Sequence, residues 1–298
     1  MMNRTNQKHK RCLLGAHFSI AKGLHNALLE AKAYGCNSVQ LFTKNANSWK
    51  ERTLTDGEIE LFEKAMADTG IAHVYSHTSY LINLASPEQK KHAMSCCALE
   101  QELLRSSQLR IPYIVLHPGS HMGHGETAGI RQIAESVSTI FLKHPKIKTR
   151  LLFETTAGQG TSIGHAFEQL AAIIKRVKPQ SKVGICLDSS HIFAAGYDIR
   201  TQMSYQETLG KLDDIIGLQH LCLIHLNDSK KDLGSRVDRH EHIGEGKLNI
   251  RAFEYMMNDT RLAEIPKIIE TPKHKDDQDG DRINLKRLRS IYRTSDSD

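Results

Sequence analysis

The sequence has no long apolar run and no apolar leader. No stretch of its 298 residues approaches the roughly 18 consecutive apolar residues of a membrane-spanning helix. The first eleven residues, MMNRTNQKHKR, are basic and polar and lack the apolar segment of a secretory signal. We therefore expect a protein that stays in the cytoplasm, where it is made, and that has no membrane partner.

The sequence also lacks the cysteine patterns of a disulfide-rich fold or a thiolate zinc site. Its six cysteines include no CxxC pair and no dense spacing, so they are expected to be reduced thiols. Cys186 and Cys222 lie within apolar runs, where a free cysteine behaves as a small hydrophobic residue. No metal role is predicted for either of them.

Length and composition favour one globular domain. Apolar residues make up 39% of the chain and charged residues 25%, which excludes a disordered protein. Apolar residues are spread evenly, so we expect a single domain over residues 12–298 after a disordered basic tail at 1–11. The net charge of +6 is compatible with a polyanionic partner, although such an excess is more often only a solvated surface.

Six apolar runs each end in a histidine or a carboxylate. In RLLFE, for example, Leu151, Leu152 and Phe153 predict a short buried parallel strand that ends at Glu154. One polar strand end is usually only solvated. If six such ends share one face, however, imidazoles and carboxylates without matching cations predict a metal site. The six residues are His77, His117, Glu154, Asp188, His225 and Glu270.

Strand and helix signals alternate along the whole chain. Strands are expected at 12–19, 38–42, 72–76, 113–116, 151–154, 183–187, 221–224 and 268–269, and each is followed by a helix signal. The polar ends at 77, 117, 154, 188 and 225 are 34 to 40 residues apart. This regularity predicts an α/β fold of the (β/α)₈ TIM-barrel type, with its active site at the C-terminal face of the strands. The alternative is a doubly wound open sheet. It is disfavoured because this sequence has no glycine-rich phosphate loop after the first expected strand.

Capping residues predict where three of the helices begin. Thr55 and Glu58 form the pattern of a capping box, and the same pattern is seen in Ser204 and Glu207. The segment that starts with Ser86 has proline next and glutamine at the third helical position, which indicates a helix N-terminus. Residues 188–198, DSSHIFAAGYD, are expected to be a loop.

Three further candidate ligands, His191, Asp238 and His240, lie in the loops that follow two of these strands. Together the nine candidates are too many for one ion, whereas two ions take six to eight donors and three take all nine. Nitrogen and carboxylate donors suit catalytic Zn²⁺, with Mn²⁺ or Fe²⁺ as substitutes. A carboxylate such as Glu154 can bridge two ions, because it has two oxygens. Clusters of this kind activate water and clamp phosphate, so phosphodiester hydrolysis is the predicted reaction.

Ten short motifs carry a specific resemblance. In order they are GAHFS, FTKN, HTSYLINL, HPGSH, ETTAGQG, LDSSHIFAAGYD, HLNDSK, GSRVDRH, IGEG and IIET, from Gly15 to Glu270. The chain thereby resembles the endonuclease IV family of apurinic/apyrimidinic (AP) endonucleases. This resemblance implies a TIM barrel with three Zn²⁺ per chain that acts in base excision repair. It would cleave duplex DNA 5′ of an abasic site and leave a 3′-hydroxyl and a 5′-deoxyribose phosphate. It implies a monomer with no protein partner, associated with the nucleoid if the source is bacterial.

The resemblance also implies how the ligands are shared among the ions. Glu154 would bridge the first two ions, and Glu154 and Glu270 would be the catalytic carboxylates. The first ion would also be held by His77 and His117. The second would also be held by Asp188, His225 and Glu270. The third would be held by His191, Asp238 and His240.

Candidate DNA contacts lie in the loops after the strands. By the resemblance, Tyr80 and Leu81 match a wedge that fills the gap where the abasic nucleotide swings out. Three departures occur: Asn47 stands in place of a family arginine, Lys22 in place of a glycine and Thr155 in place of an asparagine. We expect altered DNA affinity and intact chemistry. The full set of candidate contacts is Lys44, Asn47, Tyr80, Leu81, Arg236 and Arg239.

Two other functions fit parts of the pattern. Sugar isomerases and epimerases on similar barrels also place carboxylates and histidines around one or two divalent ions, but a small-sugar pocket requires neither a third site nor residues like Tyr80 and Leu81. A DNA-binding protein with structural metals is disfavoured, because structural sites are usually closed cages of four ligands. His17 is equally compatible with a role beside the metal ligands and with a structural one.

Overall fold

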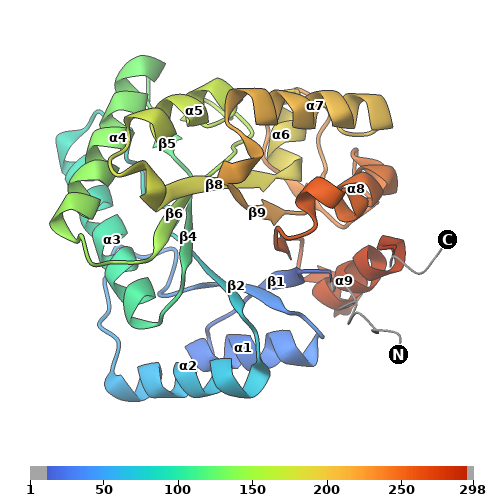
Figure 1. Cartoon of the computed structure of the whole chain (residues 1–298), viewed down its shortest axis with the longest axis horizontal. Helices are drawn as coiled ribbons and strands as arrows, with labels where there is room; N and C mark the ends of the chain where they lie inside the picture. The colour runs from blue at the N-terminus through green and yellow to red at the C-terminus, as the bar shows by residue number, and fades with distance from the viewer. Residues whose placement is uncertain (1–11, 294–298) are drawn as a thin grey trace, which may run out of the picture.

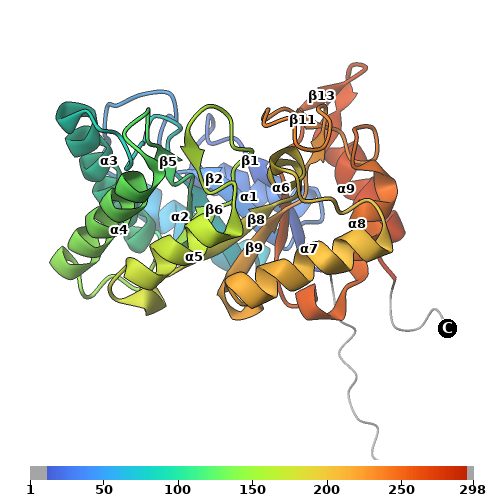
Figure 2. The ribbon, with the colours of Figure 1, turned by 90° about the horizontal axis from the view of Figure 1, so that it is seen from above.

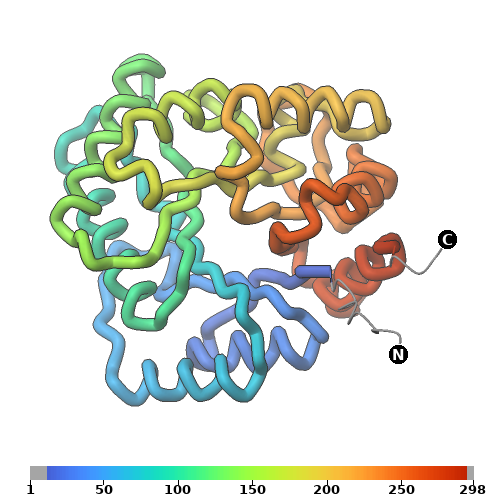
Figure 3. The backbone as a smooth tube through the Cα atoms, in the orientation of Figure 1, coloured from blue at the N-terminus to red at the C-terminus, as the bar shows by residue number. Residues whose placement is uncertain are grey.

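Eight parallel strands form a closed barrel in the computed structural model, which describes residues 12–293. The predicted tail at 1–11 lies outside the described residues. Strand β1 pairs with β2 on one side and with β12 on the other, so the start of the barrel lies beside its C-terminal part (Figure 3). The barrel strands are β1 (Leu14–Phe18), β2 (Ser38–Phe42), β3 (His73–His77), β4 (Tyr113–Leu116), β6 (Arg150–Glu154), β8 (Val183–Asp188), β9 (Leu221–His225) and β12 (Lys267–Ile269).

Helices surround this barrel, as Figure 1 shows. The predicted TIM-barrel fold is therefore confirmed. Within the described residues, no helix has the length and apolar character needed to cross a bilayer. The α-helices are α1 (Leu24–Ala33), α2 (Asp56–Thr69), α3 (Gln89–Gln108), α4 (Glu126–Lys143), α5 (Phe167–Arg176), α6 (Ser189–Ala195), α7 (Gln202–Ile215), α8 (Asn249–Asn258) and α9 (Gly280–Ile291). Three short 3₁₀ helices are η1 (Gln180–Lys182), η2 (Leu218–His220) and η3 (Thr260–Leu262).

Short antiparallel strand pairs decorate the loops that follow the barrel strands. In Figure 2, which is turned by 90° from Figure 1, β11 and β13 lie at the upper edge of the molecule. The pairs are β5 (Gly119–Ser120) with β7 (Ser162–Ile163), β10 (Asp228–Ser229) with β11 (His240–Glu241), and β13 (His274–Lys275) with β14 (Gln278–Asp279). The pair of β10 with β11 lies in the loop that carries Asp238 and His240.

The predicted helix starts are confirmed in one case and wrong in two. Helix α2 begins with the expected capping box of Thr55 and Glu58. Helix α3 is capped by Glu88 instead of Ser86, whose hydroxyl accepts a hydrogen bond from the Glu88 backbone N–H at 3.3 Å. Helix α7 starts one turn early, because Thr201 has extended backbone and forms the capping box with Ser204.

Residues 188–198 are not wholly a loop, because they contain helix α6. Asp188 ends β8 and also caps α6, since its carboxylate accepts from the backbone N–H of His191 at 2.8 Å. Gly196 ends the helix in the left-handed conformation, with φ at 112°. The helix therefore places His191 one turn beyond the end of strand β8.

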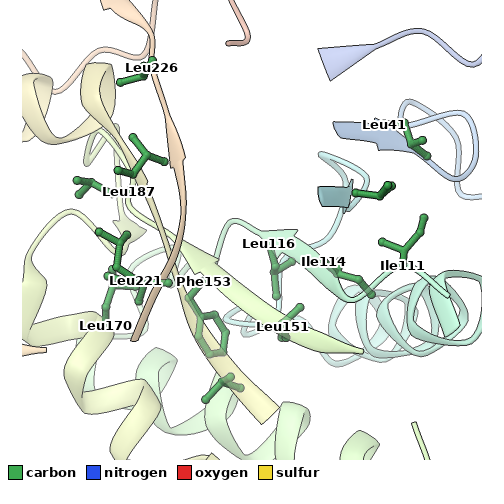
Figure 4. Packing of buried hydrophobic residues seen from close by; sticks show 14 of the residues in the cluster. Leu41, Ile111, Ile114, Leu116, Leu151, Phe153, Leu170, Leu187, Leu221 and Leu226 are labelled. Atoms are coloured by element: carbon green, nitrogen blue, oxygen red, sulfur yellow. The ribbon is translucent and has the colours of Figure 1, made fainter. Parts of the chain in front are cut away.

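Alternate strand positions face two different layers. One set packs outward against the helices, and Figure 4 shows part of it, with Ile114 and Leu116 of β4 beside Leu151 and Phe153 of β6. The other set fills the inside of the barrel. Its buried members are Tyr75, Val115, Leu152, Cys186, Leu223 and Ile268.

Each residue of this inner cluster is followed two positions later by a predicted metal ligand. Because side chains of a strand alternate with period two, the ligand points to the same inner side as the apolar residue before it. The six ligands reached in this way are His77, His117, Glu154, Asp188, His225 and Glu270. The barrel interior is thus apolar in the layer of the inner cluster and polar at the C-terminal ends of the strands.

Candidate metal centre

Eight of the nine predicted ligands form three overlapping groups at this mouth. Within each group, one ligand atom per residue lies within 4.8 Å of the others. Glu154 belongs to the first two groups, and Asp188 belongs to the second and the third. The groups are His77, His117 and Glu154; Glu154, Asp188, His225 and Glu270; Asp188, His191 and His240.

Asp238, the ninth predicted ligand, lies against the third group. Its carboxylate oxygens are 3.1 Å from Nε2 of His191 and 3.4 Å from Nε2 of His240. The loop between β10 and β11 therefore brings Asp238 to the two imidazoles with which the sequence grouped it. All nine side chains lie together at one end of the barrel.

Glu154 is the central carboxylate and is fully buried. Its Oε2 lies 3.2 Å from Nε2 of His77 and 2.9 Å from Nε2 of His117. Its Oε1 lies 3.0 Å from Nδ1 of His225. The two oxygens face different imidazoles, which is the geometry that a carboxylate shared by two ions requires.

Backbone carbonyls fix the orientation of three imidazoles. Since a carbonyl oxygen can only accept, the ring Nδ1 must be the donor, which leaves the Nε2 lone pair for a ligand. These bonds join His77 to Thr78 (2.8 Å), His191 to Thr155 (2.8 Å) and His240 to Glu270 (3.2 Å). Nε2 of His191 and of His240 are buried without a hydrogen-bond partner. Rings held in this way, with a free buried nitrogen, fit metal-ligating histidines.

Gln40 is a site residue that the sequence analysis missed. It is fully buried on β2, and its Nε2 donates to Oε1 of Glu270 at 2.5 Å. Its Oε1 lies 2.8 Å from Nε2 of His225, which must donate, so that Nδ1 of the same ring faces Glu154. His17, also against Glu270 at 3.3 Å, completes this group. A glutamine in the middle of the apolar run SVQLF was the available signal.

Asn227 is a second missed residue and bridges two candidate ligands. Its Nδ2 donates to Oδ2 of Asp188 at 2.6 Å, and its Oδ1 accepts from the backbone N–H of Glu270 at 2.7 Å. The Ser189 hydroxyl donates to the Asn227 carbonyl at 2.7 Å and so holds the asparagine itself in place. No sequence spacing announces this residue, because its partners come from two other strands.

Three carboxylates of the cluster, Glu154, Asp238 and Glu270, have pKa values below the ordinary ones. Burial disfavours the charge of Glu154, but the imidazoles of His117 and His225 outweigh burial and hold its pKa well below the ordinary value. Burial also disfavours the imidazolium of His191, yet the Asp188 carboxylate helps to raise its pKa well above the ordinary value. Protons on the imidazoles thus balance the buried negative charge. A divalent cation would supply the same balance, because metal binding displaces such protons.

The thiol of Cys186 lies beside the cluster. Its Sγ is within 4.8 Å of ligand atoms of Glu154 and His225. Burial raises the pKa of Cys186 to about 12. Because metals bind the thiolate and this thiol stays protonated, the interpretation of Cys186 as a small hydrophobic residue of the inner cluster remains.

Comparisons with known proteins place this geometry in a family. The family model described as "Xylose isomerase-like TIM barrel" matches residues 28–291. The probable endonuclease 4 of Geobacter sulfurreducens is 46% identical over 280 residues, which are 94% of each chain. The chain belongs to the endonuclease IV family. The crystal structure of endonuclease IV from Thermus thermophilus superposes with a TM-score of 0.83 at 33% identity, over 93% of this chain and 98% of that one.

Membership of the endonuclease IV family bears on the alternative functions. A D-tagatose 3-epimerase-like protein also superposes, with a TM-score of 0.70 over 93% of this chain and 96% of that one, but at 16% identity. At that identity the likeness shows only a shared barrel fold. The predicted assignment to the nucleases of the endonuclease IV family is confirmed by the far higher identity of the relatives that bear that name.

Tyr80 and Leu81, the wedge predicted from the endonuclease IV resemblance, lie at the rim of the metal centre. The Tyr80 side chain is 63% exposed, and its ring centroid lies 5.9 Å from that of His77 and 5.5 Å from that of Phe42. Leu81 is half-buried beside it. Asn47, at the tip of the preceding loop, is exposed. The wedge and this loop tip thus flank the site on the side of β2 and β3.

The predicted basic contacts of this endonuclease IV family member differ in accessibility. Arg236 and Arg239 are exposed in the loop that leads to β11, on either side of Asp238. Lys44 is only 5% exposed, and its Nζ lies 3.3 Å from Oε1 of Glu51. The structure therefore brings the two arginines to the surface but buries Lys44, which turns its ammonium inward instead of toward a ligand.

Proposed function

We propose that this chain is a metal-dependent AP endonuclease that hydrolyses the phosphodiester bond 5′ of an abasic site in duplex DNA. The products would be a 3′-hydroxyl and a 5′-deoxyribose phosphate, as in base excision repair. The observation that carries the proposal is the cluster of five imidazoles and four carboxylates at the mouth of the barrel. Its chemistry suits phosphate esters, and the relatives are named endonuclease 4.

The donor set supports three zinc ions. His77 and His117 would hold one ion together with Glu154, which would be shared with a second ion. Asp188, His225 and Glu270 would complete the second, and His191, Asp238 and His240 would hold the third. The Nε2 atoms of His191 and His240 favour this assignment, since both are buried, make no hydrogen bond and lie 3.1 and 3.4 Å from the Asp238 carboxylate. Ions at these places supply Lewis acidity toward phosphate oxygens and make a water more acidic.

The residues of the chain itself orient and sequester this chemistry. Glu154 and Glu270, the proposed catalytic carboxylates, are held in their charged form inside the barrel mouth. Gln40 and Asn227 fix the directions of the ligands that they bind. Tyr80 and Leu81 offer an apolar edge beside the site, which can fill the gap left where no base is stacked. Exposed Arg236 and Arg239 are suited to phosphate contacts.

The test is a nicking assay on a duplex with one abasic analogue. The zinc-loaded protein, without added Mg²⁺, should cut the damaged strand once, on the 5′ side, and leave an end that a polymerase can extend. Prolonged chelation should abolish the activity. Glu270→Gln should lower turnover by at least roughly 10³-fold while much of the DNA affinity remains, because the lost charge acts on the reacting centre.

The controls separate the site from general effects. An undamaged duplex of the same sequence should stay intact. Glu135→Gln makes the same change on an exposed face of α4 and should leave turnover as it is. Absence of cleavage at full metal occupancy would remove the proposed function, and normal turnover of Glu270→Gln would show that the cluster is misassigned.

A further inference from the structure

A buried ion network joins helix α3 to the loop that follows β2. Arg105 of α3 is 2% exposed and uses its guanidinium in three directions. Nε donates to the Thr43 hydroxyl at 2.9 Å, one terminal nitrogen donates to Glu51 at 2.5 Å, and the other donates to Glu102 at 2.8 Å. Thr43 and Glu51 belong to the loop at residues 43–55, here termed the second loop, whereas Glu102 belongs to α3.

The network continues within the second loop. The Thr43 hydroxyl donates to Glu102 at 2.7 Å, so it accepts from one buried charge and donates to another. Lys44 pairs with Glu51 at 3.3 Å and donates to the Ser48 carbonyl. Two cations and two anions thus balance one another at the base of the loop.

The second loop in turn contacts the residues that follow His77. The Ser79 hydroxyl donates to the carbonyl of Ala46, and both residues are 7% exposed. Tyr80, the exposed member of the proposed wedge, is the next residue along the chain. Arg105 is therefore linked to the rim of the metal centre by hydrogen bonds to Thr43 and Glu51, by the backbone of the second loop, and by the hydrogen bond between Ala46 and Ser79.

Burial of such a network is a poor way to gain stability. Taking ions out of water costs several kcal/mol each, and apolar residues of similar size often stabilise a core as well or better. What a buried arginine supplies is direction, since its planar fork fixes three acceptors at once. The acceptors here lie on α3 and at both ends of the loop segment that carries the exposed Asn47.

We propose that Arg105 is a positioning residue for DNA binding, which holds the second loop in place through Thr43 and Glu51. The inference rests on the proposed function, because DNA is the ligand. It assigns a role to a side chain that reaches neither the metal centre nor the solvent. Loss of the network should loosen the second loop and the wedge beside it, weaken substrate binding, and leave the chemistry at the metals intact.

The second loop carries its own reporter, because Trp49 is the single tryptophan of the chain. Trp49 is half-buried and packs against the main core. Its fluorescence, and the access of acrylamide to it, therefore report loop mobility in the full metal-loaded protein without any label. This measurement needs no DNA.

The decisive variant is Glu51→Gln, which weakens the link between Arg105 and the loop but leaves the pair with Glu102 intact. We expect KM and Kd for the abasic duplex to rise roughly three- to tenfold, which is the size of one ordinary hydrogen bond's net contribution. The kcat should stay within about twofold, since no group at the reacting centre changes. Acrylamide should quench Trp49 more strongly. Arg105→Lys keeps the positive charge but loses the planar guanidinium. It should show the same changes as Glu51→Gln.

The control is Glu63→Gln on α2, which removes the same charge from an exposed pair with Arg110 at 2.9 Å. Loss of a carboxylate alone should tighten binding to a polyanion, so weaker binding of Glu51→Gln has the opposite sign to a pure charge effect. If Glu51→Gln and Arg105→Lys bind and quench like Glu63→Gln, the positioning role is overturned. If the wild type neither binds nor cuts the abasic duplex, the proposed function is wrong, and so is the role of Arg105 in DNA binding. Acrylamide quenching of Trp49 then still shows whether the network holds the second loop.

Discussion

At the scale of single residues, Gln40 connects candidate ligands that come from different strands. A carboxamide has a donor and an acceptor, and here the donor holds Glu270 while the acceptor holds His225. A leucine or methionine would fill the same space but would leave both ligands free to turn. Because a metal site depends on ligand direction, Gln40 should matter although it carries no charge.

Gln40→Met should therefore weaken the metal centre without unfolding the barrel. Loss of a partner that orients ligands typically costs about 10–100-fold in metal affinity or activity. Competition with a chelator of known affinity measures the first quantity, and the nicking assay measures the second. Gln132→Met on α4, which loses one hydrogen bond to the Ser86 carbonyl at 2.9 Å, is the control and should bind metal like the wild type. Equal metal affinity in both variants would contradict the orienting role.

The gathering of the candidate ligands at one end of the barrel could be predicted from the sequence, whereas their hydrogen-bond partners could not. His225 and Glu154 each end an apolar run, and period two sends them to the inside of the barrel with the residue two positions before. Gln40 meets its partners only because β2 is set in register beside β1 and β3, opposite His17 and Tyr75. That register depends on tertiary packing, which a local pattern does not contain.

At the scale of elements, the pairing of β1 with β2 requires a glycine. Gly15 faces Ser38, and a Cβ built on Gly15 would lie 1.8 Å from the Ser38 carbonyl oxygen. The obstacle is backbone, which cannot move aside as a flexible side chain can. At Gly15 the first strand therefore approaches β2 more closely than a residue with a Cβ atom would allow.

We expect Gly15→Ala to lower the free energy of unfolding by about 1–3 kcal/mol or more, because an added carbon forces the two strands apart. Urea unfolding of the metal-free protein measures this change. Gly210→Ala, inside α7 with open space around the position, should instead raise stability by up to about 1 kcal/mol, because alanine is the better helix former. A neutral Gly15→Ala would show that β1 can shift without cost.

Element types were easier to predict than element ends. Helix α6 has only seven residues and is buried on nearly every side, so no apolar period marks it in the sequence. The start of α7 was placed at Ser204 because Ser204 and Glu207 have the capping pattern. Thr201 lacks this pattern, because the residue three positions later is Ser204 instead of a glutamate or glutamine, so the sequence pattern does not mark the observed start.

At the scale of the whole molecule, the two ends of the barrel differ in kind. The C-terminal mouth holds the charged cluster, whereas the N-terminal end carries residues whose role is stability, as is usual for this fold. Lys267, the first residue of β12, is 2% exposed there. Its Nζ donates to the carbonyls of Leu262 and Ile265 at 2.7 and 2.9 Å. Burial lowers the pKa of Lys267 to about 8.

This buried ammonium should make stability depend on pH at the alkaline end. The folded protein releases the Lys267 proton near pH 8, whereas the unfolded chain keeps it until roughly pH 10.4. Between these values the unfolded state binds more protons, so a rise in pH favours the folded state. The cost of burying the charge is fully present below pH 8 and disappears as the pH approaches the unfolded value.

Lys267→Met removes this titration, and a Cys12→Ser background in both proteins removes a nearby thiol whose pKa the Lys267 charge lowers. The unfolding free energy of the wild type minus that of Lys267→Met should rise by roughly 2 kcal/mol between pH 7 and pH 10. Urea unfolding of the two metal-free proteins at both pH values gives the difference. Nicking by metal-loaded Lys267→Met at pH 7 should match that of the wild type, because the residue lies at the opposite end of the barrel from the cluster. A difference that stays constant with pH would mean that Lys267 keeps an ordinary pKa in the folded protein, and lost activity would mean that the two ends of the barrel are coupled.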